Sequence, residues 1–190
     1  DKKFKKEKKQ EIGIVAVSGG HISLKTCALD PVSIDLDVNY GEGFKEVHES
    51  IIDKLNERKN GLYILRGIPG SGKSSYIKFL SKLSERKLAY IPVSMIDSLV
   101  QPNFSNFLLD NKNLVLVIED AEKAVVSRNN KTGNEAWVSA ILNLSDGILG
   151  SLLNTSIILT FNTQESEIDS ALLRKGRLLV DHEFDILTVK

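Results

Sequence analysis

Residues 67–74 contain the clearest chemical pattern in the chain, with a glycine at the start and the run Gly-Lys-Ser at the end. The segment matches the spacing G-x-x-x-x-G-K-[ST], whose glycines let the backbone curl so that successive N–H groups face a phosphate. In this pattern the Lys73 ammonium reaches the β- and γ-phosphates, and the Ser74 hydroxyl binds Mg²⁺. We therefore predict a loop that binds ATP and Mg²⁺ through Gly67, Pro69, Gly70, Ser71, Gly72, Lys73, Ser74 and Ser75.

Two carboxylates follow an apolar run in the middle of the chain. Leu114–Ile118 is apolar throughout, and Glu119 and Asp120 come directly after it. Ligands of open α/β sheets bind outside the carboxyl ends of the strands. There, one acid can orient Mg²⁺, usually through water, while the next polarises the attacking water. We predict that Glu119 is the metal-side acid and Asp120 the water-side acid, in the reverse of the usual order. The alternative is a strand that simply ends in a charged turn.

A further apolar run, Ile157–Phe161, ends in a single amide, Asn162. An asparagine near the two acids can hold the hydrolytic water close to the γ-phosphate. An asparagine after a strand is otherwise only a cap or a turn residue. The position of Asn162 after the acid-bearing strand favours the water-holding role.

The spacing of apolar residues predicts the elements that must position these groups. Helices are expected at 44–60, 73–83 and 136–144, a loop or short helix at 97–110, and strands at 62–65, 88–93, 114–118, 156–161 and 178–184. Strands that are apolar throughout and alternate with helices are typical of a parallel sheet covered on both faces. The predicted fold is therefore the α/β fold of P-loop NTPases.

The residues before this core differ from it in charge and in residue pattern. Residues 1–10 hold six lysines against Asp1 and Glu7 and predict a basic, disordered leader, with a nucleic-acid- or lipid-binding arm as the alternative. Residues 11–40 predict a small β-rich extension, with short strands at 12–17, 21–29 and 33–38 and a turn at Gly19–Gly20. Residues 41–190 then form the core domain.

The stretch Ile168–Arg177, which reads Ile-Asp-Ser-Ala-Leu-Leu-Arg-Lys-Gly-Arg, resembles the second region of homology of the AAA family of ATPases. Ile141–Gly147 is similar to another stretch of that family, and the order Glu119–Asp120 is most similar to the branch of the mitochondrial AAA protein that inserts the Rieske iron–sulfur subunit. The resemblance covers about residues 61–184. Lys175 replaces the proline that is usual in the family.

The resemblance implies a homo-oligomeric ring, expected to be a hexamer in the full-length form. Arg174 and Arg177 then reach the γ-phosphate of a neighbouring subunit and supply positive charge. The family's small helical lid would begin near Lys190, so we expect this chain to lack it.

The amino-acid composition bears on the class of partner and on the cellular location, but it does not identify a substrate. Lys and Arg together equal Asp and Glu at 25 each, so the net charge of zero gives no argument for nucleic acid or an anionic membrane. The single cysteine, Cys27, suits a reducing compartment, and neither a membrane span nor a secretory signal is visible, so we expect a cytoplasmic protein.

The expected function is ATP turnover coupled to the remodelling of a protein or nucleoprotein partner. One alternative is an ATP-dependent DNA-transaction factor that resembles a helicase loader. The other is a nucleotide-gated scaffold with negligible turnover. Among the histidines, His182 would neighbour the nucleotide only if the last strand paired with the strand before the phosphate-binding loop.

Overall fold

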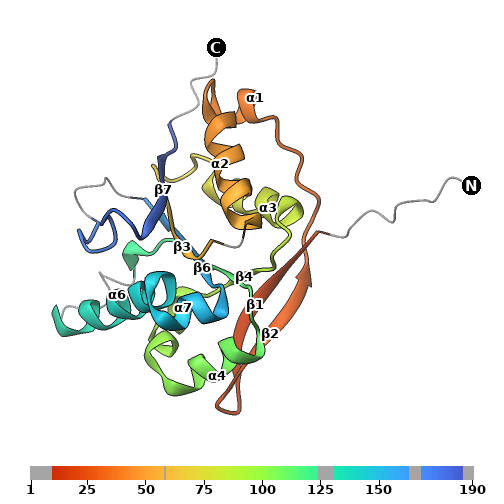
Figure 1. The fold of residues 1–190 in the computed structure, drawn as a ribbon. Coiled ribbons are helices and arrows are strands. Elements are labelled where there is room, and N and C mark those ends of the chain that lie inside the picture. The colour runs from red at the N-terminus through yellow and green to blue at the C-terminus, as the bar shows by residue number, and fades with distance from the viewer. Residues whose placement is uncertain (1–9, 58, 124–130, 163–167, 186–190) are drawn as a thin grey trace, which may run out of the picture.

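The computed structural model describes residues 10–57, 59–123, 131–162 and 168–185 (Figure 1). In chain order the elements are β1 Glu11–Ser18, β2 His21–Ala28, α1 Leu36–Tyr40, α2 Phe44–Asn56, β3 Gly61–Arg66, α3 Lys73–Leu83, β4 Leu88–Tyr90, the 3-10 helix η1 Val93–Val100, α4 Pro102–Asp110, β5 Val115–Ile118, α6 Lys131–Asp146, α7 Ile148–Leu153, β6 Ser156–Phe161 and β7 Leu178–Glu183.

Within the described residues one sheet of seven strands forms the centre of the molecule, in the order β2-β1-β4-β5-β6-β3-β7. Every neighbouring pair is parallel except β1 and β2, which form an antiparallel hairpin at one edge. Helices α2 and α3 cover one face of the sheet, and α4, α6 and α7 cover the other (Figure 1). The predicted α/β fold, with a parallel sheet between two layers of helices, is confirmed.

Burial on both faces explains why the central strands are apolar throughout. Along β5, Leu116 and Ile118 pack with the residues of α4 and α6, whereas Val115 and Val117 pack with those of α2 and α3. Successive side chains of a strand point to opposite faces, so a strand covered on both sides needs an apolar residue at every position. Each of these four side chains is completely buried.

The predicted N-terminal β extension is continuous with this sheet. Strand β1 pairs with β4 in parallel through Gly13 opposite Ala89 and Ile14 opposite Tyr90. Gln10, placed at the end of the leader by the sequence, is buried, and its side-chain oxygen accepts a hydrogen bond from the Val32 amide at 3.2 Å. Strands β1 and β2 therefore extend the core sheet, while residues 1–9 of the predicted leader lie outside the described residues.

The strand predicted at 33–38 is wrong, because Leu36–Tyr40 form the short helix α1. The Asp35 carboxylate accepts hydrogen bonds from the amides of Asp37 and Val38, at 3.1 Å each. This arrangement is an N-cap, which satisfies amide groups at the start of a helix that have no partner within it. The cap stabilises a helical turn that the alternation of side chains did not indicate.

Other boundaries differ from the prediction in smaller ways. Strand β4 ends at Tyr90, just before Pro92, which has no amide hydrogen to donate to a strand ladder. Helix α2 ends at Asn56, α6 begins at Lys131, and the sequence did not indicate α7. In the described ranges no helix is both long enough and apolar enough to cross a bilayer.

The last strand does pair with the strand before the phosphate-binding loop, because β7 lies beside β3 with His182 opposite Leu65. The imidazole packs against Phe44 and Phe184, with ring centroids 4.9 Å away in each case. Burial lowers the pKa of His182, with the nearby carboxylates of Asp185 and Asp181 acting in the opposite direction. His182 is thus a packed residue beside the strand that carries the phosphate-binding loop.

Candidate active site

Apart from Arg174 and Arg177, the predicted site residues come together at the carboxyl ends of neighbouring strands. The phosphate-binding loop follows β3, Glu119 and Asp120 follow β5, and Asn162 follows β6, which lies between those two strands. A cavity of about 580 Å³ opens there. One side is lined by Pro69, Gly70, Gly72, Lys73, Ser74 and Ser75, and the other by Asp120, Glu122, Lys123, Thr160 and Asn162.

Backbone geometry requires glycine at key positions of the loop. Gly67, Gly70 and Gly72 have φ of 146°, 83° and 91°, a region that L-amino acids with side chains rarely adopt. A Cβ on Gly67 would lie 2.6 Å from the Phe184 carbonyl oxygen, so the loop also approaches the neighbouring backbone too closely for a side chain. Gly72 caps α3 without any side-chain hydrogen bond, which leaves the first amides of the helix open to an anion.

Lys73 is buried and folds back onto its own loop. Its ammonium donates hydrogen bonds to the carbonyl oxygens of Gly67 at 2.6 Å and Ile68 at 2.9 Å, and to the Ser71 hydroxyl at 3.2 Å. Burial lowers the pKa of Lys73, and the carboxylates of the site, first among them Asp120, act against that shift. The lysine therefore holds the loop in its curled shape.

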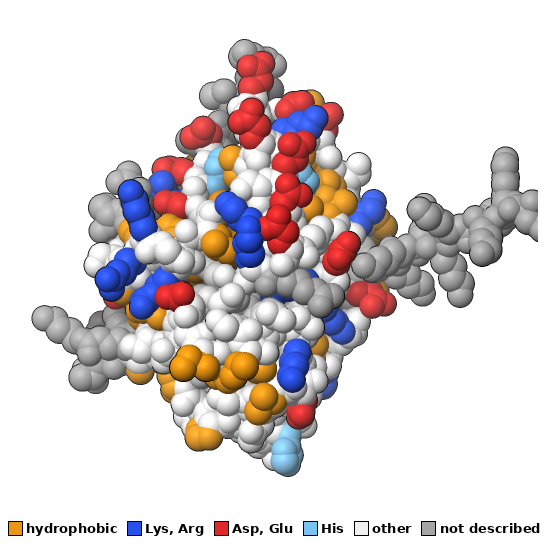
Figure 2. All heavy atoms as spheres, viewed as in Figure 1, with side chains coloured by type: hydrophobic (Ala, Val, Ile, Leu, Met, Phe, Trp, Pro, Cys, Tyr) orange, Lys and Arg blue, Asp and Glu red, His pale blue; other side chains and the backbone are white. Residues whose placement is uncertain are grey.

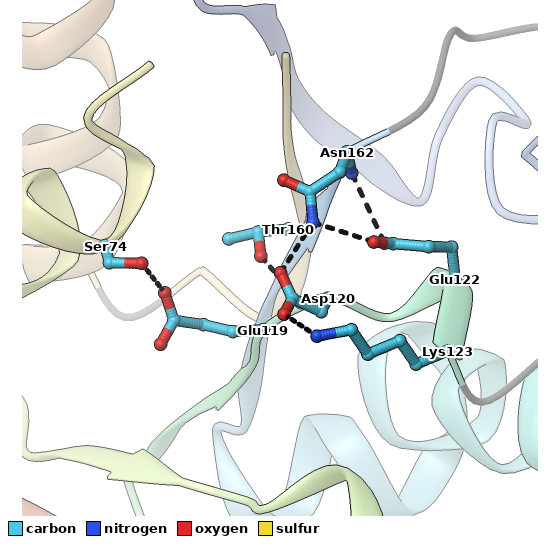
Figure 3. A network of polar contacts seen from close by, with 7 residues as sticks. All are labelled: Ser74, Glu119, Asp120, Glu122, Lys123, Thr160 and Asn162. Carbon is cyan, nitrogen blue, oxygen red and sulfur yellow. Dashed lines mark hydrogen bonds and ion pairs between the residues drawn. The ribbon is translucent and has the colours of Figure 1, made fainter. Parts of the chain in front are cut away.

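Ser74, in the first turn of α3, contacts Glu119, which follows β5 and is not among the residues that line the cavity. The Ser74 hydroxyl donates a hydrogen bond to the Glu119 carboxylate (Figure 3). Both are hard oxygen ligands, which Mg²⁺ prefers. No cluster of three or more His, Cys, Asp and Glu side chains able to hold a metal occurs in the part of the chain that the structure describes. The donor set fits an Mg²⁺ ion bound by one or two protein oxygens and completed by phosphate oxygens and water.

Asp120 sits at a sharp turn that β6 holds in place. Its φ of 51° lies in the left-handed region, which aspartate adopts more readily than most residues. The amide of Asp120 donates to the Thr160 hydroxyl at 3.0 Å, and the amide of Ala121 donates to the Thr160 carbonyl oxygen at 2.9 Å. This turn directs the Asp120 carboxylate toward Asn162, whose amide nitrogen donates to it at 2.7 Å.

The Asp120 carboxylate also forms an ion pair with Lys123, one turn further along the chain (Figure 3). The hydrogen bond from Lys123 is the main cause that lowers the pKa of Asp120, and the Asn162 amide adds to it. Burial acts in the opposite direction. Asp120 is consequently ionised at neutral pH.

Sequence reasoning missed Glu122, Lys123 and Thr160, which all line the cavity. Glu122 accepts hydrogen bonds from the Asn162 side chain at 2.8 Å and from the Asn162 main-chain amide at 3.3 Å. The signal available was a second acid three residues after Glu119, close to a predicted site. The turn at Asp120 brings this acid back to the cavity, and the spacing of apolar residues gives no indication of that turn.

The two predicted arginines lie away from the cavity and are not among the residues that line it. Arg177 is partly buried, and its Nε lies 2.8 Å from a carboxylate oxygen of Asp146, at the end of α6. Arg174 is exposed. Both belong to the segment that leads into β7, and neither is among the residues that line the cavity of their own chain.

The chain is similar in sequence to known ATPases. The family model described as ATPase family associated with various cellular activities (AAA) matches residues 63–186. AAA-ATPase At2g18190 of Arabidopsis thaliana is 29% identical over 188 residues, which cover 90% of this chain and 37% of that protein.

Two further relatives carry a mitochondrial designation. The mitochondrial chaperone BCS1 of Homo sapiens is 31% identical over 127 residues, covering 61% of this chain and 29% of that protein. AAA-ATPase At3g28570, mitochondrial, of Arabidopsis thaliana is 25% identical over 148 residues, covering 72% of this chain and 33% of that protein. The chain thus spans about a third of the length of each of these relatives.

Proposed function

The chain belongs to the AAA family of ATPases, and from this premise we propose that it binds Mg-ATP in the cavity beside Lys73 and hydrolyses it within a homo-oligomeric ring. The observation that carries the proposal is the convergence of three groups at the ends of β3, β5 and β6. These groups are the glycine-rich loop with Lys73, the Ser74–Glu119 pair and the Asp120–Asn162 pair. A ring of six subunits is the expected assembly.

Binding would use the parts of the loop that are free to meet an anion. The open amides at the start of α3 would donate to phosphate oxygens, aided by the positive end of the helix dipole. Lys73 would exchange the carbonyl oxygens of Gly67 and Ile68 for the β- and γ-phosphates. Ser74 and Glu119 would hold Mg²⁺, which neutralises charge on the phosphates when bound.

Hydrolysis would depend on the pair Asp120 and Asn162. The oxygen of a water held between them forms the new bond to the γ-phosphorus while the bond to the bridging oxygen of ADP breaks. The Asp120 carboxylate accepts the proton that this water loses. Catalysis of this kind rests on positioning and charge neutralisation, with no covalent intermediate.

Arg174 and Arg177 would act on the nucleotide of the neighbouring subunit. Both lie outside the cavity of their own chain, and Arg177 is held by an exposed ion pair with Asp146. An exposed ion pair contributes only about 0–1 kcal/mol, so the arginine can be released at small cost when a partner with higher charge is present. This placement supports a role across a subunit boundary.

The work driven by hydrolysis is proposed to be the remodelling of a protein or nucleoprotein partner. One face of the molecule is poorly suited to binding DNA, which argues against a DNA-loading role there. Asp and Glu side chains gather over its upper part, where α1 and α2 lie (Figure 2). The exposed acids there include Glu42, Glu46, Glu49 and Asp53, and such a surface repels phosphates.

The cytoplasmic location stays a prediction, since named relatives include mitochondrial proteins.

The test measures ATP turnover per chain as a function of protein concentration, and then mixes two inactive variants. Lys73→Ala removes the side chain that binds the phosphates. Arg177→Ala removes the arginine that is proposed to reach the γ-phosphate of the neighbouring subunit. In a mixed assembly an Arg177→Ala subunit still binds ATP, and its Lys73→Ala neighbour still offers an arginine. Activity is expected to return at those interfaces, because an arginine supplied by a neighbouring subunit can raise the rate of hydrolysis by about 10³-fold or more.

Lys175→Ala is the matched control, since this exposed cation lies between the two arginines and lines no part of the cavity. Its turnover should equal that of the parent chain. Absence of activity in mixed assemblies that are shown to form would refute the role in trans. Absence of ATP binding by the parent chain would refute the proposed function altogether.

A further inference from the structure

The side-chain amide of Asn162 has both of its hydrogens engaged. Its nitrogen donates to Asp120 at 2.7 Å and to Glu122 at 2.8 Å. An amide NH₂ group carries two hydrogens, so these contacts use its full donor capacity. Among the described residues the amide oxygen has no hydrogen-bond partner, so it is the group available for a further contact, and it can only accept.

Two carboxylates fix which way the amide faces. The reverse orientation would place the amide oxygen against the oxygens of Asp120 and Glu122, where all groups are acceptors and repel one another. Figure 3 shows the Asn162 oxygen pointing away from both carboxylates. Asp120 alone would leave one hydrogen of the amide without a partner, and Glu122 supplies that partner.

Glu122 also fixes the backbone from which this amide extends. One carboxylate oxygen accepts from the side chain of Asn162 at 2.8 Å, and the other accepts from its main-chain amide at 3.3 Å. Glu122 reaches this position because Ala121 is tied to the Thr160 carbonyl oxygen at 2.9 Å. A single carboxylate therefore restrains both the position and the rotation of the amide.

We propose that Glu122 is a positioning residue that holds Asn162 with its amide oxygen facing the water that attacks ATP. The inference rests on the proposed function. A water that donates one hydrogen to the Asn162 oxygen and the other to the Asp120 carboxylate keeps its own lone pair free for the γ-phosphorus. An Asn162 turned the other way would donate to the water instead, and would occupy the lone pair that must attack.

The test is a double-mutant cycle on turnover with Glu122→Ala and Asn162→Ala. Misplacing a catalytic group by about 1 Å costs on the order of 10²-fold in rate, so each single variant should lose between about 10- and 100-fold in kcat. The affinity for ATP should stay within about threefold, because neither side chain belongs to the phosphate-binding loop. The double variant should be no slower than Asn162→Ala, since Glu122 acts only through Asn162.

Glu122→Gln provides a variant of equal shape, which keeps the test valid if the alanine variant does not fold. It should lose turnover as well, because a glutamine amide can pair with either orientation of Asn162. Glu85→Ala is the matched control, an exposed glutamate in the turn before β4, far from the cavity, and its turnover should not change.

A second readout does not depend on hydrolysis. The side-chain amide protons of Asn162, observed by NMR in protein labelled with ¹⁵N-asparagine and identified with Asn162→Ala, should exchange slowly with water. Glu122→Gln should speed this exchange at least tenfold. If the parent chain hydrolyses no ATP, the proposed function fails, while the exchange experiment still decides the orientation of Asn162.

Three outcomes would overturn the inference. The first is a Glu122→Ala variant that folds and keeps kcat within twofold of the parent. The second is a further tenfold loss when Glu122→Ala is added to Asn162→Ala. The third is unchanged exchange of the Asn162 amide protons in Glu122→Gln.

Discussion

Arg86 lies at the end of the sheet opposite the cavity and is buried. Its guanidinium donates to the Leu114 carbonyl oxygen at 2.7 Å, the Ser156 hydroxyl at 2.6 Å, the Asn113 carbonyl oxygen at 3.2 Å and the Asn154 carbonyl oxygen. These acceptors lie at the start of β5 and β6, the strands that deliver Asp120 and Asn162 at their other ends. Arg86 thus ties together the beginnings of two strands whose ends must align.

Replacing Arg86 with methionine keeps much of its length and removes its donors. Hydrogen bonds to a charged group contribute about 1.5–3 kcal/mol each, so the contacts above sum to about 6–12 kcal/mol. Burying the guanidinium costs several kcal/mol, which offsets a large part of that sum. We expect a net loss of about 3–5 kcal/mol in the free energy of unfolding. For a chain of this size, about 2–4 °C per kcal/mol lowers Tm by roughly 6–20 °C.

The assay is urea denaturation followed by circular dichroism, together with thermal melting. Lys87→Met is the matched control, because the neighbouring lysine is exposed and should change stability by less than about 1 kcal/mol. ATP affinity measured well below Tm should be close to normal, since Arg86 is not among the described residues that line the cavity. An Arg86→Met protein within 1 kcal/mol of the parent would refute the assignment of Arg86 as an anchor of β5 and β6.

Three further predictions concern the site and its surroundings. Lys73→Ala should abolish binding of a fluorescent ATP analogue and lower Tm by a few degrees, because the ammonium also braces the loop; near-normal affinity in a folded variant would contradict this. Asp120→Asn should keep ATP binding and lose turnover, whereas Glu119→Gln should weaken Mg²⁺-dependent binding, and the opposite pattern would invert the two roles. Burial lowers the pKa of His182, so the unfolded chain binds a proton that the folded chain does not. Stability should therefore fall as pH drops below about 6.5, and His182→Gln should reduce this slope in melting experiments; an unchanged slope would show that His182 does not cause it.

The sequence carried enough information to predict the parts of the site that follow strands directly. The glycine-rich loop, Glu119, Asp120 and Asn162 each come immediately after an apolar run, and parallel strands bring such positions to one edge of a sheet. The same reasoning predicted a sheet covered on both faces. The family resemblance placed Arg174 and Arg177 at a subunit boundary, which stays a prediction.

Other features could not be predicted, because they depend on contacts between residues distant in sequence. Glu122 and Lys123 enter the cavity only because Asp120 adopts a left-handed turn that Thr160 holds from the next strand. The alternation at 33–38 suggested a strand, but the cap formed by Asp35 decides for a helix. The order of strands, which places β1 beside β4, is likewise absent from local patterns.

The place of β3 in the sheet has a consequence for how the protein is made. This strand carries the phosphate-binding loop, yet both of its neighbours, β6 and β7, are encoded about 100 residues or more further along the chain. A ribosome adds about 5–20 residues per second, so about 120 residues of synthesis separate the end of β3 from the end of β7 by roughly 6–24 s. Until β6 and β7 have been synthesised, β3 lacks both of the neighbours with which it pairs in the folded sheet. The residues that line the cavity extend to Asn162, so the cavity can be complete only after β6 has been synthesised.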